Sequence, residues 1–417
     1  MKSRETEVRR PNHMNVPVKA RSSRAADPGY PSVATELEQL NIGQEKVWEV
    51  PASANSRYLS HDYFRYIGKF PPQIAHRLIV EFSKPGDLVL DPMCGGGTVL
   101  IESKLLGRRA VGCDINPVAL IVARVSTRSI HPAKLEKALG SVRESLSQLI
   151  SPGELFSQGQ TWRRRFDFAG CEHFFDGETL DNLDRIRQYL DELDDIEVRE
   201  FLLLAVLSTL RKVSLANVKK MNVVVDPHKQ RAQLFPTLFK KLEEMEKVNR
   251  ELDRLFSRCS ITVMERDALE PPKEKHFASL AIVHPPYISN TAFSESTQLQ
   301  LGFLGIRHTS IWKKELRVRG SYVHEPDGLR KYLVGWHRIL ANMFEALKPG
   351  GFCVLIVGDG RIDFVRIPMR AITAEFCKDI GFCEEAAFLH RLNNNTGWTL
   401  THKMREQHVV VFRKPTR

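Results

Sequence analysis

The stretch that decides the fold, residues 87–107, reads DLVLDPMCGGGTVLIESKLLG. It begins as a short apolar strand pattern and ends as a helix pattern that stops at a glycine, with three consecutive glycines at the turn between them. A second strand pattern, RRAVGCDI, follows over residues 108–115. Together they predict a β-α-β unit, in which ligands bind beyond the carboxyl ends of the strands. The glycine turn is therefore a candidate binding loop.

Further strand patterns lie far along the chain, after a long helical stretch. They are SITVMERDA, FASLAIVHPPY, GFCVLIVGD and EQHVVVFRK, which begin at residues 260, 277, 351 and 406. The predicted fold is α/β, a Rossmann-like doubly wound sheet with an inserted helical subdomain. We divide the chain into a flexible basic N-terminal arm (1–50), the first part of the sheet domain (51–125), the helical insertion (126–257) and the second part of the sheet domain (258–417).

The composition is that of a globular chain with a basic surface. The 417 residues are 42% hydrophobic and carry a formal net charge of +11, which favours a polyanionic partner. No apolar run is long enough to span a membrane, and the first residues lack the core of a signal peptide, so we expect a cytoplasmic location. The seven cysteines are scattered singly and no histidines stand at metal spacing, which predicts reduced thiols and no metal site.

The glycine turn does not match the usual phosphate-binding loops. No Gly-Lys-Ser/Thr follows it, and Gly95, Gly96 and Gly97 do not fit the spacing G-x-G-x-x-G. Asp114, at the end of the second strand, is placed to accept hydrogen bonds from both ribose hydroxyls of a nucleoside. Asp267 is placed to meet the exocyclic amine of its adenine. Taken alone, such residues would equally well cap helices and turn the chain.

Two motifs together resemble the amino-methylating DNA methyltransferases, the N-4 cytosine and N-6 adenine enzymes, which bind S-adenosyl-L-methionine. The segment DPMCGGGT is similar to their D-P-F-C-G-S-G-T loop, with Met93 in place of the usual Phe and Gly96 in place of the usual Ser. The segment YIGKFPPQIAHRLI (66–79) looks like the motif that lines the methionine end of the cofactor. The resemblance implies a methyltransferase sheet and a cofactor site made of Lys69, Phe70, Asp91, Pro92, Cys94, Gly95, Gly97, Thr98, Asp114, Asn116 and Asp267.

The second motif is HPPY (284–287), which resembles the catalytic S-P-P-Y or D-P-P-Y of that family. An amino nitrogen conjugated into a base ring is a poor nucleophile, so the site must accept its protons while the methyl group arrives in line from a sulfonium. The expected acceptors are the side chain of His284 and the carbonyl of Pro285. Pro286 helps to fix the turn, and Tyr287 stacks on a base flipped out of the duplex. A Pro-Pro-Tyr turn by itself is also plausible as a plain loop.

His284 departs from the family pattern, which has Ser or Asp at this position. A neutral imidazole nitrogen can accept a hydrogen bond as those residues do. The position lacks the carboxylate of D-P-P-Y, and ISNTAFSESTQLQLGFLG (288–305) looks like the segment after S-P-P-Y, so cytosine N-4 is favoured over adenine N-6. Carbon-5 methylation is excluded, because it needs a Pro-Cys loop and the chain has no Pro-Cys dipeptide.

Basic runs predict where double-stranded DNA binds. The run IRHTSIWKKELRVRG (306–320) follows the catalytic motif, and its cations are expected to contact phosphates: Arg307, Lys313, Lys314, Arg317 and Arg319. WRRRF (162–166) and LRKVSLANVKK (210–220) are further candidates, although a solvated helix face explains each of them equally well.

Three functions stay open at this point. The leading one is a site-specific DNA methyltransferase, with a restriction endonuclease as an expected partner. The second is a base methyltransferase of transfer RNA, because such enzymes share the sheet and a D-P-P-Y-like loop. The third is a catalytically impaired nucleic-acid-binding relative, which the histidine at position 284 suggests.

Overall fold

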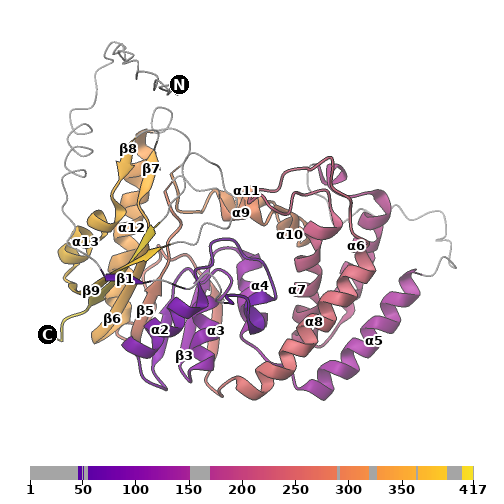
Figure 1. The fold of residues 1–417 in the computed structure, drawn as a ribbon, viewed down its shortest axis with the longest axis horizontal. Helices are drawn as coiled ribbons and strands as arrows, with labels where there is room; N and C mark the ends of the chain where they lie inside the picture. Colours follow the sequence, from indigo (N-terminus) through magenta and orange to yellow (C-terminus); the bar gives the residue numbers. More distant parts are fainter. Residues whose placement is uncertain are drawn as a thin grey trace, which may run out of the picture.

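An eight-stranded sheet forms the centre of the part of the chain that the structure, a computed structural model, describes (Figure 1). The strands lie in the order β1-β9-β10-β6-β5-β2-β3-β4, and all run parallel except β10, which is antiparallel to both of its neighbours. The described residues are 46–48, 50, 55–150, 170–288, 292–318, 326–362, 365–391 and 406–416. The strands are β1 (Lys46–Trp48), β2 (Leu88–Asp91), β3 (Arg109–Asp114), β4 (Ile261–Glu265), β5 (Ala278–Val283), β6 (Leu347–Val357), β9 (Cys383–Arg391) and β10 (Glu406–Arg413), with β7 (Gly360–Ile362) and β8 (Val365–Ile367) as a separate pair.

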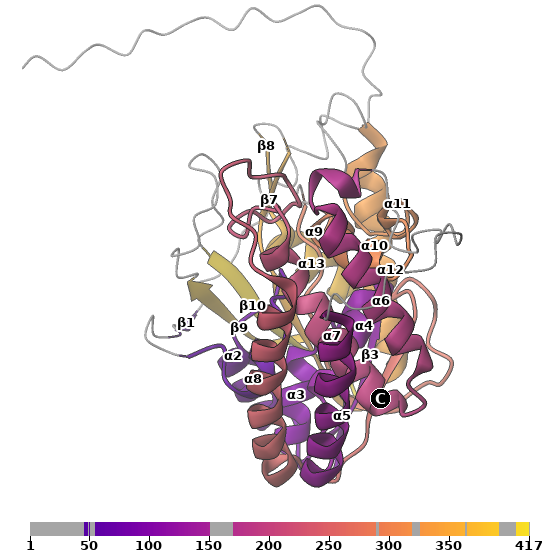
Figure 2. The ribbon, with the colours of Figure 1, turned by 90° about the vertical axis from the view of Figure 1, so that its right-hand side faces the viewer.

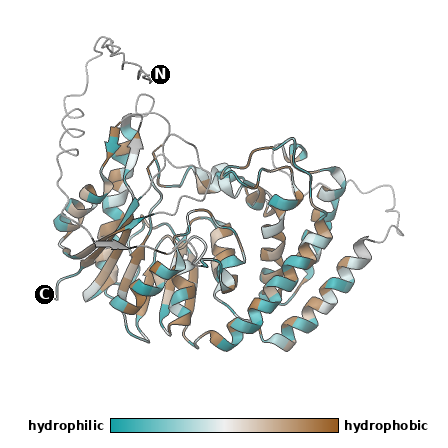
Figure 3. Ribbon diagram, in the orientation of Figure 1, coloured by the Kyte–Doolittle hydropathy of each residue, from teal (hydrophilic) through white to brown (hydrophobic). Residues whose placement is uncertain are grey.

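Successive residues of the central strands enter two different cores. Val89 of β2 packs in the core with α2 and α3, whereas its neighbour Leu90 packs in the core with α12 and α13. Because side chains alternate along a strand, the sheet is the middle of three layers, and its strands are the brown centre of Figure 3. The covering helices are α2 (Pro72–Phe82), α3 (Thr98–Leu105), α4 (Pro117–Ser126), α12 (Pro326–Ala346) and α13 (Met369–Ile380).

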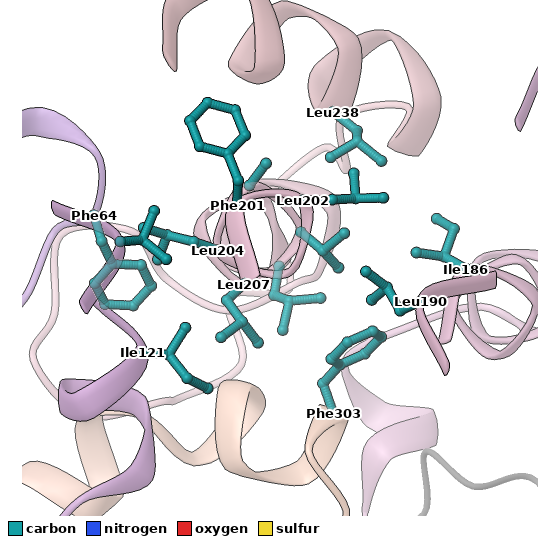
Figure 4. Close-up of a cluster of buried hydrophobic side chains, with 14 of the residues drawn as sticks. Phe64, Ile121, Ile186, Leu190, Phe201, Leu202, Leu204, Leu207, Leu238 and Phe303 are labelled. Carbon is teal, nitrogen blue, oxygen red and sulfur yellow. The ribbon is translucent and has the colours of Figure 1, made fainter. Parts of the chain in front are cut away.

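The stretch between β3 and β4 folds mainly as helices, and Figure 2 shows α5, α7 and α8 side by side. The buried leucines of α7 point outward in several directions, toward α4, α6, α8 and α10 (Figure 4). Because every face of α7 is covered, its sequence is apolar nearly all round. None of the helices in the described ranges has the length and hydropathy to cross a bilayer. Besides α4, the helices of this stretch are α5 (Pro132–Ile150), α6 (Gly177–Glu192), α7 (Ile196–Val213) and α8 (Leu234–Leu255), with the 3-10 turn η2 (Cys171–His173). The short helices α9 (Phe293–Ser296), α10 (Gln298–Phe303) and α11 (His308–Trp312) follow β5, and the 3-10 turn η1 (Leu59–Asp62) precedes α2.

The order of the strands brings two distant loops together. From β2 the chain passes outward to β3 and β4, and then returns to β5 on the other side of β2. β2 and β5 are paired in parallel, with Leu90 opposite Ala281, so their carboxyl ends lie side by side. This is the switch point of a doubly wound sheet, where such folds bind ligands. The glycine turn after β2 and the HPPY motif after β5 therefore meet at one edge of the sheet.

One expectation from the sequence is wrong at its boundary. The flexible arm was placed over residues 1–50, yet β1 pairs in parallel with β9, with Lys46 opposite Phe388 and Trp48 opposite His390. Without β1, β9 would be an edge of the sheet, and pairing satisfies its backbone groups. The earlier part of the arm, the run WRRRF and Arg319 lie outside the described residues.

Candidate cofactor and catalytic site

A pocket of about 1180 Å³, which includes open solvent at its mouth, joins the two loops. It is lined by the glycine turn, by the HPPY motif, and by residues that follow β3 and β4. All four residues of HPPY line it, and so does every predicted cofactor residue except Gly97, which packs behind the loop against Ala123 of α4. The site that the sequence predicted in separate pieces is thus one cavity.

The glycine turn is shaped by the segment that precedes α2. Gly95 and Gly97 have φ angles of +48° and +79°, which L side chains rarely adopt. A side chain at Gly96 would meet the Cε atom of Lys69 at 2.2 Å, and one at Gly95 would meet the ring of Tyr66 at 3.0 Å. The turn therefore needs glycine to admit this neighbouring segment as well as a ligand.

Two carboxyls, Asp91 buried and Asp114 half-buried, line the pocket. Asp114 accepts hydrogen bonds from the backbone N–H groups of Gly95 (2.9 Å) and Asn116 (2.8 Å), and Asp91 accepts one from Met93 (3.2 Å). Burial raises the pKa of Asp91 to about 8 and that of Asp114 to about 6. Desolvated carboxyls of this kind gain from a ligand that brings a cationic amino group or hydroxyl donors. A nucleoside with an amino-acid tail carries both, so the residues present fit S-adenosyl-L-methionine.

Two of the predicted cofactor residues use their polar side-chain atoms within the protein. The Asn116 side chain caps α4, where its oxygen accepts the N–H of Val118, and its amide donates to Thr297 at 3.2 Å. The Lys69 ammonium donates to two backbone carbonyls at 3.2 Å, and burial lowers its pKa to about 8. In this structure both residues shape the pocket wall and tie it to neighbouring segments.

The HPPY corner is held by hydrogen bonds from several elements. Nε2 of His284 lies 2.6 Å from the hydroxyl of Tyr287, and that hydroxyl also contacts the side-chain oxygen of Gln407 on β10. The Gln407 amide nitrogen is in turn 2.8 Å from Nδ1 of His390 on β9, and the two residues are opposite each other in the sheet. Tyr332 of α12 donates to the carbonyl of the second proline at 2.7 Å.

These contacts differ from the expectation of a free acceptor at His284. Burial lowers the pKa of His284 to about 4, so the imidazole is neutral at pH 7. Nε2 of the ring already has Tyr287 as its partner, and that hydroxyl also contacts Gln407. This ring nitrogen is therefore engaged within the protein. The sequence could not show this, because Gln407 lies on β10, more than 100 residues after His284.

Several lining residues were not predicted from the sequence. The rings of Tyr66 and Phe293 are parallel, with an interplanar angle of 6° and centroids 6.1 Å apart, and both line the pocket. Met221, Arg266 and Glu315 line it as well. Glu315 accepts hydrogen bonds from Ser294, and its burial raises its pKa. In the sequence, the aromatic residue Phe293 soon after HPPY was the one feature that indicated this wall of the pocket.

The predicted phosphate-binding residues are spread apart. Lys314 lines the pocket, and Arg307 and Lys313 are exposed. The guanidinium of Arg317 is 3.8 Å from the ring centroid of Trp312, and both side chains are partly buried. Of these residues, Lys314 is therefore the one placed beside a bound ligand.

Comparison with known proteins points to one family. The model of a DNA methylase family, which covers N6- and N4-methylating enzymes, matches residues 2–124, a range that contains the glycine turn and the segment 66–79. The Type II methyltransferase M.MvaI of Kocuria varians is 28% identical over 166 residues, which are 39% of this chain and 36% of that protein. M.MjaII of Methanocaldococcus jannaschii is 33% identical over 79 residues, 19% of this chain and 15% of that protein.

Other matches include a relative named for its action on transfer RNA and a solved structure. A tRNA (guanine(10)-N2)-dimethyltransferase of Methanothermobacter thermautotrophicus is 33% identical over 116 residues, 22% of this chain and 34% of that protein. A solved S-adenosylmethionine-dependent methyltransferase of Methanosarcina mazei aligns with 82% of this chain and 98% of its own, at 11% identity and a TM-score of 0.34. The chain spans about a third or less of the length of each curated relative named here. The family match, the Rossmann-like sheet and the two motifs in one pocket make the chain similar to the amino-methylating DNA methyltransferases, and the residues that line the pocket fit the cofactor S-adenosyl-L-methionine.

Proposed function

We propose that the chain methylates an exocyclic amino group of a base in double-stranded DNA, with cytosine N-4 favoured over adenine N-6. The observation that carries this proposal is the meeting of the glycine turn and the HPPY motif in one pocket at the switch point of the sheet. Similarity of residues 2–124 to the DNA methylase family supports the class of substrate. A base stacked in a duplex cannot enter such a pocket, so the target base leaves the stack.

The chain's own residues prepare the amino group for attack. When bound, S-adenosyl-L-methionine supplies a methyl carbon whose bond to a positively charged sulfur breaks with its electron pair going to sulfur. The carbonyl of Pro285 accepts an N–H of the amino group, which lets the lone pair localise on the nitrogen. The ring of Tyr287 forms a wall for the flipped base. The proton that the nitrogen loses passes to water at the open mouth of the pocket.

His284 has a supporting part in this proposal. Its Nε2 is bonded to the Tyr287 hydroxyl, and the ring makes an edge contact with Phe70, with ring centroids 5.4 Å apart. We assign the imidazole the task of holding Tyr287 in place, and we leave the acceptor role to the Pro285 carbonyl. The absence of a carboxylate at position 284 is what favours cytosine over adenine.

A second candidate is an exocyclic amino group of a base in transfer RNA. The similarity to a tRNA (guanine(10)-N2)-dimethyltransferase favours it, since guanine N-2 is also an exocyclic amine. The purified full chain, supplied with labelled cofactor, duplex DNA and transfer RNA, tests both candidates. Label in DNA supports the proposal, and label in transfer RNA alone overturns it. Cofactor binding without transfer to either would identify a catalytically impaired binding protein.

The base, the atom and the site are tested together in a second experiment. The chain is expressed in a host free of DNA methylation, and the genomic DNA is sequenced with detection of modified bases. We expect N-4-methylcytosine in one short sequence context. N-6-methyladenine would overturn the choice of base while leaving the class of reaction intact. The restriction endonuclease partner stays a prediction.

A further inference from the structure

The loop between α7 and α8 reaches the pocket from the helical part of the chain. Its two arms are bonded to each other, because Asn217 N–H donates to the Val224 carbonyl at 2.9 Å and Asp226 N–H donates to the Leu215 carbonyl at 2.8 Å. We call residues 215–226 the rim hairpin. Met221, near its tip, lines the pocket. The helical stretch therefore contributes directly to the site that the two motifs form.

One half-buried guanidinium fixes the tip of the rim hairpin. Arg211, in the last turn of α7, donates to the carbonyls of Asn217 (3.1 Å), Lys220 (3.0 Å) and Met221 (2.7 Å) within the hairpin. It also donates at 2.9 Å to the carbonyl of Ser296, the last residue of α9. Arg211 presents its donors in a rigid planar fork, so it ties the tip to the segment that follows HPPY.

The tip of the rim hairpin presents two lysines to solvent. Lys219 and Lys220 are exposed, and their backbone N–H groups are held by the Asn217 side chain at 2.9 and 3.1 Å. Both side chains therefore extend from a backbone that is already fixed. Lys220 directly precedes Met221 and Lys219 precedes Lys220, so both lysines belong to the part of the hairpin that reaches the pocket.

Further cations lie around the hairpin. Arg65 donates to the carbonyl of Val218 in the hairpin. Lys229 donates to the carbonyls of Ser214 and Ala216 at 2.6 and 2.9 Å. Asp226 is the carboxylate of the hairpin, and its side chain accepts from Asn217 at 2.9 Å. Arg65, Lys219, Lys220 and Lys229 outnumber it, and such an excess of positive charge attracts polyanions.

We infer that the rim hairpin is a phosphate clamp that grips the nucleic-acid backbone next to the nucleotide held in the pocket, with Lys219 and Lys220 binding the phosphates. This inference rests on the proposed function and deepens it. The run after HPPY was expected to supply this grip, but it places one cation, Lys314, on the pocket wall. The rim hairpin faces the same opening from the helical side. A flipped nucleotide would then have its backbone held by a rigid element.

Equilibrium binding measures the clamp independently of methyl transfer. The full chain and the variant Lys219→Ala/Lys220→Ala are titrated with a labelled duplex of about 25 base pairs at several salt concentrations. The matched control is Lys137→Ala/Lys247→Ala, which removes two exposed lysines from α5 and α8, neither of which lines the pocket. We expect the hairpin variant to bind more weakly and its slope of log K against log salt to fall by about 1.8, because each phosphate contact contributes roughly 0.9.

The outcomes separate the clamp from the proposed function. A slope that falls equally in both variants, or in neither, overturns the inference, because the effect would come from net charge alone or be absent. A fall in this slope that is confined to the hairpin variant supports the inference, even if the chain transfers no methyl group. The same titration with transfer RNA identifies the source of the phosphates. Cofactor affinity and the melting temperature of both variants are expected to match those of the wild type, since all four lysines are exposed.

Discussion

The hydroxyl of Tyr287 connects the HPPY corner to the sheet. It contacts Nε2 of His284 on one side and Gln407 on the other, and Gln407 has 2% of its surface exposed. A polar chain of this kind inside the protein fixes the orientation of every group in it. Tyr287 is therefore oriented before any base arrives.

If His284 acts through the Tyr287 hydroxyl, the effect of removing His284 on kcat depends on whether that hydroxyl is present. Tyr287→Phe keeps the ring and deletes the hydrogen bond, and we expect kcat for methyl transfer to fall about tenfold, as for the loss of one hydrogen bond of ~1.4 kcal/mol. His284→Ala should cost far less in the Tyr287→Phe background than in the wild type. Independent, multiplying effects on kcat would show that His284 contacts the substrate itself. Cofactor affinity by calorimetry serves as the control.

Single residues were predictable where a motif assigns them and unpredictable where their partners are distant in sequence. Asp91, Asp114 and the HPPY residues line the pocket as the motifs imply. No local pattern shows that Lys69 packs on Gly96, because that contact depends on how the segment before α2 meets the turn after β2. The place of Met221 in the pocket wall could not be predicted for the same reason, since Met221 comes from a loop of the helical stretch.

Helix α7 holds the helical stretch to the sheet. Its side chains share a core with α4, which follows β3, and with α10, which follows HPPY. The long apolar run FLLLAVLSTL (201–210) by itself indicates a core-facing helix, and Figure 4 shows its side chains surrounded by other elements. A cavity in this core should therefore affect the chain as a whole.

Leu204 and Leu255 provide a matched pair for testing this. Leu204 on α7 is fully buried, whereas Leu255 at the end of α8 is 54% exposed. We expect Leu204→Ala to lower the free energy of unfolding by about 2–5 kcal/mol, through lost burial and a residual cavity. Leu255→Ala should change it by less than about 0.5 kcal/mol. Urea unfolding followed by circular dichroism measures both, and equal midpoints for the two variants would contradict the packing described here.

The helices and strands that could be predicted from the sequence are those whose apolar residues recur with one consistent period. The helical patterns VREFLLLAVLSTLRKVS (198–214) and FPTLFKKLEEMEKVNRELDRLF (235–256) coincide with α7 and α8 to within two residues, and the strand patterns ending at Asp91 and Asp114 coincide with β2 and β3. β9 was not predicted, because two glutamates follow its first residue in CEEAAFLHR and most of its side chains are exposed or half-buried. Its partner β1 is three residues long, too short for a periodic signal. Both are strands because they pair with neighbours in the sheet that are distant in sequence.

The pocket walls come from both parts of the sheet domain, so a ligand bound there should stabilise the whole chain. At a free cofactor concentration of 100 times Kd, S-adenosyl-L-methionine is expected to add about 2.7 kcal/mol to the free energy of unfolding. The raised pKa values of Asp91 (about 8) and Asp114 (about 6) add a pH dependence.

The direction of the pH dependence follows from which protonation state of Asp91 and Asp114 the cofactor prefers. A cationic amino group and hydroxyl donors favour the ionised carboxyls, which become protonated as the pH falls through their pKa values. We therefore expect the stabilisation by cofactor to shrink between about pH 8.5 and pH 5.5. Thermal melting with and without cofactor measures it. Asp114→Asn should weaken binding and flatten the lower part of the profile, and a wild-type profile that does not change with pH would refute the assignment of these carboxyls.

The separation of the two pocket walls along the chain has a consequence for how the protein is made. The ribosome completes the turn after β2 long before β5 exists, and domains acquire their structure as units once the needed segments have emerged. During that interval the nascent polypeptide has only one half of its cavity. Binding of S-adenosyl-L-methionine to the nascent chain would then show that translation has passed the HPPY motif and that the strands after it have joined the sheet.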